Sequence, residues 1–189
     1  MNVANFPSPL FRKCREIKGQ IQERKGVPDF IKLAQQNSNI QFVWAGGFSF
    51  GRLTDGYSEL KKVVDNPPTN LLFTGIVSRK EIAELNNAAD LFLLPSFNEL
   101  FPMSVLEAFS CGTPVMLRDL DLYHSIIDGD YEPAKDVSEM QTKLVELTHN
   151  PERLNYLRER AVETSKRYSK DHLAKVWDRF YRQQAKEAN

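Results

Sequence analysis

The chain has 189 residues, the length of about one domain and enough to bury a large apolar core. Lysine plus arginine and aspartate plus glutamate each number 25, so the formal net charge is zero and no basic excess indicates nucleic-acid binding. A content of 41% hydrophobic and 11% aromatic residues excludes an intrinsically disordered chain.

Charge is distributed unevenly along the chain. Residues 1–26 carry six basic and two acidic side chains, and residues 150–189 carry ten and six. The middle, residues 27–149, carries nine and seventeen. This pattern is typical of solvated helix faces, and the basic ends are also compatible with contact to an anionic membrane surface.

The two cysteines, Cys14 and Cys111, lack the spacing of metal ligands. We recognise no secretory leader, so a reduced, cytoplasmic protein is expected. The longest uninterrupted apolar run is Leu91–Leu94, far shorter than the roughly 20 residues of a membrane-spanning helix.

Short apolar runs alternate with amphipathic stretches after an aperiodic, proline-punctuated start. Residues 1–14 are therefore expected to be a linker or the cut end of a longer protein, and residues 15–189 one domain. Strands are expected at Ile17–Ile21, Ile40–Ala45, Leu71–Thr74, Leu91–Leu94 and Pro114–Leu117. Helices are expected at Val27–Gln36, Tyr57–Val64, Arg79–Asn87, Pro102–Ser110 and Leu120–Ile127, and in pieces from about Val137 with breaks near Asn150 and Ser169.

This alternation predicts an α/β fold with a doubly wound parallel sheet that is Rossmann-like and covered by helices on both faces. In such sheets, ligands bind outside the carboxyl ends of the strands. The residues that directly follow each strand are therefore the candidates for a functional site.

Glu99 follows the fourth expected strand, and Glu107 lies eight positions later on the next helix. Pro102 suits the first helical position and Phe101 has no side-chain oxygen for a cap, which leaves three N–H groups free, those of Phe101, Met103 and Ser104. Such a helix N-terminus can hold a diphosphate, and the two carboxylates could accept sugar and ribose hydroxyl groups. The spacing alone also allows Glu99 to cap its own helix and Glu107 to be a solvated helix residue.

The same segment resembles the signature of the retaining glycosyltransferases of family 4, which have the GT-B architecture. The resemblance lies in Glu99, Phe101, the pair Glu107–Ala108 and the run Gly112–Val115, although Pro102 stands where the family usually has glycine. It implies that Glu99 binds the donor sugar and that Glu107 binds the ribose.

The resemblance extends to other strand ends. Ile76 and Val77 match the loop that holds the base through main-chain contacts, and Lys25 matches the lysine that binds the diphosphate. Gln20 stands where the family usually has an arginine, so one cation of the phosphate clamp is missing, and Arg24 is a nearby cation that could compensate.

The resemblance covers Arg15 to Arg182 and implies the C-terminal, donor-binding half of a GT-B enzyme, without its N-terminal acceptor half. A looser resemblance of residues 42–51, 96–103 and 118–123 to bacterial diacylglycerol glycosyltransferases implies UDP-glucose or UDP-galactose as donor and a glycolipid product at the inner membrane face.

No cofactor or metal is expected, although Asp119 and Asp121 resemble a metal-binding pair. The fragment alone is expected to be inactive. The alternative is a non-catalytic, Rossmann-like interaction module with a decayed donor site.

Overall fold

A computed structural model describes residues 15–187 apart from residue 102. These residues form one six-stranded sheet in the order β3-β2-β1-β4-β5-β6, and every neighbouring pair is parallel. This is the strand order of a doubly wound Rossmann-type sheet, as expected. The strands are β1 Arg15–Lys18, β2 Phe42–Ala45, β3 Leu71–Gly75, β4 Leu91–Leu94, β5 Val115–Arg118 and β6 Glu132–Ala134.

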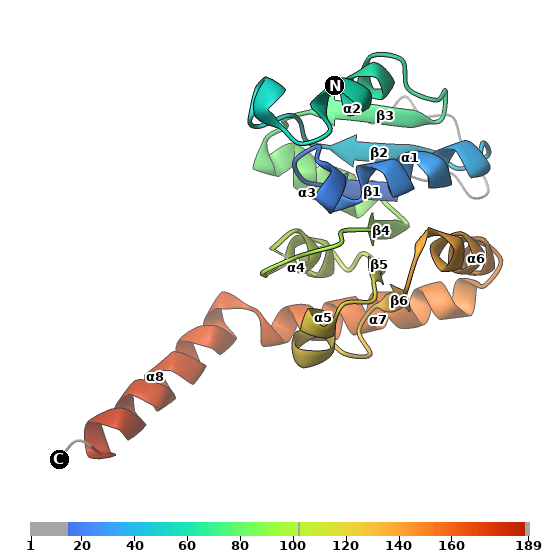
Figure 1. Ribbon diagram of the computed structural model, residues 1–189. Helices are drawn as coiled ribbons and strands as arrows, with labels where there is room; N and C mark the ends of the chain where they lie inside the picture. The colour runs from blue at the N-terminus through green and yellow to red at the C-terminus, as the bar shows by residue number, and fades with distance from the viewer. Residues whose placement is uncertain (1–14, 102, 188–189) are drawn as a thin grey trace.

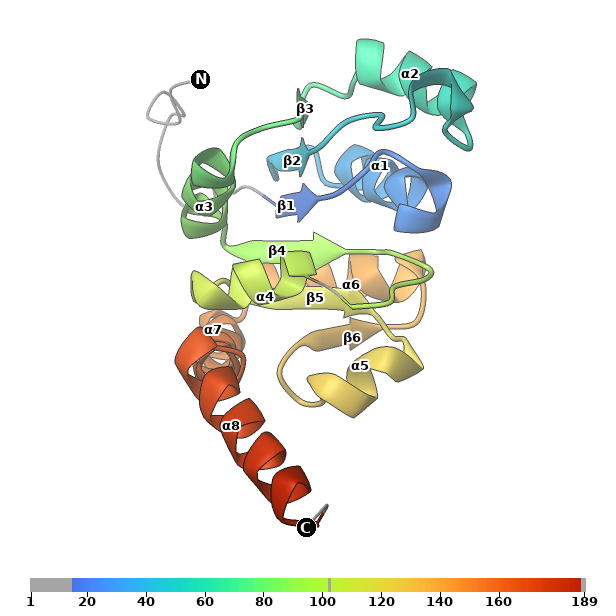
Figure 2. The same ribbon diagram turned by 90° about the vertical axis from the view of Figure 1, so that its left-hand side faces the viewer.

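Helices cover both faces of the sheet (Figure 1). Helices α3, α4 and α7 pack together on one face and α1 packs against α6 on the other, as the side view in Figure 2 shows. The α-helices are α1 Val27–Gln36, α2 Tyr57–Asp65, α3 Arg79–Ala88, α4 Met103–Ser110, α5 Asp121–Ile126, α6 Val137–Thr148, α7 Pro151–Arg167 and α8 Lys170–Glu187. Two short 3-10 turns, η2 Glu23–Lys25 and η3 Gly51–Leu53, follow β1 and β2.

The core lies between the helices and the middle of the sheet. Every residue of β2, β4 and β5 is buried, which explains why these strands read as continuous apolar runs in the sequence. The Trp44 ring is fully buried, with the Phe30 ring edge-on at 5.4 Å. Trp44 is therefore a packing residue of the core.

Local sequence signals account for several helix ends. Ser78 and Glu81 form a capping box at the start of α3, and Gly112 adopts the left-handed conformation after α4, with φ 68°. The breaks predicted near Asn150 and Ser169 are the boundaries between α6, α7 and α8.

Two strands differ most from the prediction, whereas β2, β3, β4 and β5 each begin and end within about two residues of the expected bounds. The first strand begins and ends earlier than Ile17–Ile21, because it pairs with β2 and β4 from Arg15 onward. The second is β6, which has no counterpart among the expected strands. This strand has three residues, and Pro133 interrupts its apolar pattern, which an edge strand tolerates because one side of its backbone needs no partner.

The last helix, α8, leaves the body of the domain (Figure 1) and none of its residues is buried. Figure 2 shows the same projection from the side. Within residues 15–187, residue 102 apart, no helix combines the length and apolar character needed to cross a bilayer.

Candidate functional site

The structure brings Lys25 and Glu99 together at the carboxyl edge of the sheet. Lys25 ends η2, just after β1, and Glu99 lies in the loop after β4, which is the neighbour of β1. The Lys25 Nζ atom donates to both Glu99 carboxylate oxygens, at 2.7 Å and 2.8 Å. The side chains are 17% and 8% exposed, so this ion pair is largely shielded from water.

Backbone contacts hold these two segments in register. The Arg24 carbonyl accepts a hydrogen bond from the Phe97 N–H at 2.9 Å and another from the Ser96 hydroxyl at 3.2 Å. Gly26 has φ 73°, and a Cβ atom there would lie 2.2 Å from the Pro95 carbonyl oxygen. Position 26 therefore requires glycine for two reasons: its φ is positive, and the backbone at the end of β4 leaves no room for a Cβ atom.

Gln20 and Arg24 are connected through a third side chain. The Gln22 amide donates to the Gln20 side-chain oxygen at 2.5 Å and accepts from the Arg24 Nε at 2.8 Å. This chain of hydrogen bonds links an exposed guanidinium to the position where the family usually has its arginine. That Arg24 replaces this missing cation stays a prediction.

The start of α4 differs in one respect from the expected anion site. The Met103 N–H donates to the Phe101 carbonyl at 2.9 Å, so the prediction that this group is free is wrong. The partner is a backbone carbonyl, which every residue type carries, so side-chain identity gives no signal for it. Phe101 is half-exposed and contacts the Tyr168 ring edge-on, while Ser104 is partly buried in the first turn. Pro102 lies outside the described residues.

Glu107 lies in a separate hollow between α3 and α4, of about 130 Å³. Asn86 also lines this hollow and is buried, and its side-chain oxygen has no hydrogen-bond partner among the described residues. Lys25 and Glu99 do not line it. The two residues expected to hold the base, Ile76 and Val77, lie between β3 and α3, at the carboxyl edge of the sheet. Ile76 is exposed and Val77 is partly buried.

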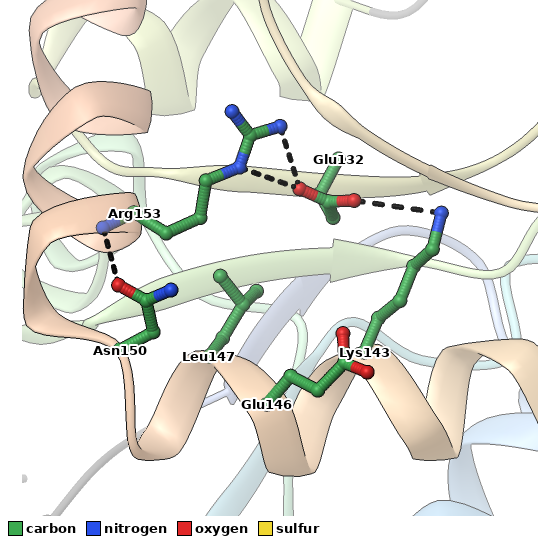
Figure 3. A pocket seen from close by; sticks show the side chains of 6 residues that line it. All are labelled: Glu132, Lys143, Glu146, Leu147, Asn150 and Arg153. Atoms are coloured by element: carbon green, nitrogen blue, oxygen red, sulfur yellow. Dashed lines mark hydrogen bonds and ion pairs between the residues drawn. The ribbon is translucent and has the colours of Figure 1, made fainter.

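A larger hollow, of about 230 Å³, lies between β6, α6 and α7 (Figure 3). Its cations are already paired: Arg153 donates twice to one Glu132 carboxylate oxygen, at 3.0 Å and 2.9 Å, and the Lys143 Nζ lies 3.4 Å from the other. Glu146 adds a second carboxylate (Figure 3), so the hollow carries balanced charge and offers little to a phosphate.

One buried side chain after β5, Tyr123, lies within the electrostatic influence of Glu99. Burial raises the pKa of the Tyr123 hydroxyl well above its usual range, and the charge of Glu99 adds to this effect. Asp119 pairs with the His124 ring at 2.9 Å. Within the described part of the chain, no group of three or more His, Cys, Asp or Glu side chains is placed to hold a metal ion.

Comparisons with known proteins agree with this architecture. The family model "Glycosyl transferases group 1" matches residues 17–164. Over 167 residues the chain is 53% identical to the alpha-galactosylglucosyldiacylglycerol synthase of Streptococcus pneumoniae, covering 88% of this chain and 45% of that protein. The chain therefore spans less than half the length of this relative.

Solved structures show the same fold. Sucrose-phosphate synthase from Thermosynechococcus elongatus superposes with a TM-score of 0.80 at 18% identity, covering 97% of this chain and 47% of that one. The C-terminal domain of a glycosyl transferase group 1 family protein (LpcC) from Francisella tularensis gives 0.70 at 20% identity, covering 86% and 88%. The fold is therefore that of the C-terminal half of a GT-B glycosyltransferase.

Proposed function

Because the chain belongs to the glycosyl transferases group 1 family, we propose that it is the donor-binding domain of a retaining hexosyltransferase. The observation that carries this proposal is the shielded contact between Lys25 and Glu99 at the carboxyl edge. Ligands of doubly wound sheets bind at this edge, and a cation beside a carboxylate can bind a phosphate and a neighbouring sugar hydroxyl group.

In this proposal, each group acts on a different part of a nucleotide-sugar. Cleavage of the sugar–phosphate bond leaves negative charge on the diphosphate, which Lys25 and the N-terminal turn of α4 stabilise. Glu99 accepts hydrogen bonds from the hexose hydroxyl groups, Glu107 accepts them from the ribose, and the backbone at Ile76 and Val77 holds the base. We assign no side chain as nucleophile, and the reaction needs no metal ion or cofactor.

Donor binding exchanges one partner of Lys25 for another. In the structure, the Lys25 ammonium is bound to the Glu99 carboxylate. A diphosphate would replace that carboxylate as the partner of Lys25, and Glu99 would then be available to the hexose hydroxyl groups. The two binding events are therefore coupled through one ion pair.

The name of the Streptococcus pneumoniae relative leads us to propose UDP-galactose or UDP-glucose as donor and a diacylglycerol glycolipid as acceptor. We further propose that an N-terminal acceptor half completes the enzyme and that it works in the cytoplasm at the membrane surface. Two exposed apolar surfaces support a partner half. One is at the carboxyl edge and comprises Phe50, Leu53, Ile76, Phe97, Leu100, Phe101 and Met103; the other is on α8 and comprises Leu173, Val176, Trp177, Phe180 and Tyr181.

Calorimetric titration with UDP tests the proposal. We expect weak binding by the chain and no turnover of UDP-hexose, because the acceptor half is needed for transfer. Lys25→Ala and Glu107→Ala should each weaken UDP binding by about tenfold to a hundredfold, whereas Lys80→Ala, an exposed lysine on α3, should not change it. Unchanged titrations for both site variants would refute the assignment. They would favour the alternative, a non-catalytic interaction module.

A further inference from the structure

Arg118, the last residue of β5, is a buried cation at the carboxyl edge that the proposed mechanism does not use. Its side chain is 8% exposed. The Nε donates to the Pro95 carbonyl at 3.0 Å, the Nη1 donates to the Lys135 carbonyl at 3.0 Å, and the Nη2 forms an ion pair with the Asp29 carboxylate. The guanidinium carbon also lies 3.9 Å from the centroid of the Phe97 ring.

These contacts reach both segments that form the Lys25–Glu99 pair. Pro95 follows the last residue of β4, four positions before Glu99. Asp29 lies in the first turn of α1, which begins directly after Lys25 and Gly26. One guanidinium therefore connects the chain just before Glu99 to the chain just after Lys25.

The Pro95 carbonyl is where these connections meet. It accepts the Arg118 hydrogen bond, and it also lies so close to Gly26 that a Cβ atom there would be only 2.2 Å away. The next two residues, Ser96 and Phe97, hydrogen bond to the Arg24 carbonyl. A shift of Pro95 would therefore move the backbone on both sides of the Lys25–Glu99 contact.

We propose that Arg118 is a positioning residue that sets the placement of Lys25 relative to Glu99 and thereby the affinity for the donor diphosphate. This inference rests on the proposed function. Arginine suits the role because its planar fork can donate in three directions at once, whereas a lysine at the same place is a single point charge. Arg118 contacts no substrate in this proposal and acts only through the two loops.

The test compares UDP affinity by calorimetry for the wild-type chain, Arg118→Met and Arg118→Lys. We expect both variants to bind UDP about tenfold to a hundredfold more weakly, since displacing a binding group by about 1 Å can cost a factor of this size. Arg160→Met is the matched control. Arg160 also pairs with a buried aspartate, Asp130, but this pair ties α7 to the loop before β6, so UDP affinity should stay within about twofold.

A double-mutant cycle separates positioning from general destabilisation. In the Lys25→Met background the positioned cation is absent, so adding Arg118→Met should change UDP affinity by less than about threefold. Thermal unfolding of each variant shows that it is folded. If Arg118→Met does not fold, Arg118→Lys and Asp29→Asn carry the same comparison, because each leaves a polar side chain in place of the original.

The outcomes are distinct. If the wild-type chain does not bind UDP, the proposed function fails. If the wild-type chain binds UDP and folded Arg118 variants bind it as well as Arg160→Met does, the inference about Arg118 is overturned while the proposed function stands. An undiminished effect of Arg118→Met in the Lys25→Met background would also overturn it, because Arg118 would then not act through Lys25.

Discussion

Replacing Glu99 by glutamine should strengthen the binding of UDP while weakening the hexose contacts of a UDP-hexose. In the wild-type chain the Lys25 ammonium makes two charge-assisted contacts to Glu99, at 2.7 Å and 2.8 Å, which a diphosphate must displace. A hydrogen bond to a charged group contributes about 1.5–3 kcal/mol, and a neutral one, which glutamine can keep, about 0.5–1.5 kcal/mol. The difference should favour UDP by about 1–1.5 kcal/mol, or roughly tenfold. Removing a negative charge beside the phosphates acts in the same direction.

Lys25→Met should have the opposite effect, because the phosphates lose their cation while the Glu99 carboxylate, 8% exposed, remains. We expect about tenfold to a hundredfold weaker UDP binding, which corresponds to about 1.4–2.8 kcal/mol. Calorimetry with UDP on both variants measures the contrast, and UDP-hexose on Glu99→Gln measures the loss of the sugar contacts. Weaker UDP binding by Glu99→Gln than by the wild-type chain would refute the reasoning that Glu99 competes with the phosphates for Lys25.

Three further predictions concern the metal, the fold and pH. Adding EDTA should leave UDP binding unchanged; a loss would instead promote Asp119 and Asp121 as metal ligands. Asp130→Asn should lower the free energy of unfolding by about 3 kcal/mol in urea titration, because Asp130 is fully buried between two arginines, without changing UDP affinity. Burial raises the pKa of Tyr131 to about 12, so the folded state holds that proton more tightly than the unfolded state. The resulting stability is complete below about pH 10 and is lost as pH rises toward 12, and Tyr131→Phe should reduce this alkaline loss in thermal unfolding scans. If Tyr131→Phe lost as much stability as the wild-type chain between about pH 10 and 12, the assignment of this loss to Tyr131 would be wrong.

The elements that follow from local pattern were predictable from the sequence. The Leu91–Leu94 strand and the Val27–Gln36 helix have the predicted bounds, because a strand buried on both faces reads as a continuous apolar run and Pro28 suits a first helical turn. The strand Glu132–Ala134 was not predictable in this way. It has no apolar run of its own, and its pairing with β5 brings it into the sheet.

The candidate site likewise has residues that the sequence predicts and residues that it does not. The functional edge of the sheet follows from the alternation of strands and helices, and the roles of Lys25 and Glu99 follow from the resemblance of their segments to the glycosyltransferase family. The role of Arg118 could not be predicted, because its partner Asp29 is 89 positions away and its other partners are backbone carbonyls, which carry no sequence signal. The hydrogen bond from Met103 to Phe101 was missed for the same reason.

The most direct measurement of the central claim is a titration of the chain with UDP followed by backbone amide chemical shifts. We predict that the largest shifts occur at the carboxyl edge, in residues 24–26 and 76–77 and in the first turns of α4 up to Glu107. Shifts concentrated around the hollow lined by Glu132, Lys143 and Arg153, or no shifts at millimolar UDP, would contradict the claim that this edge binds a nucleotide-sugar.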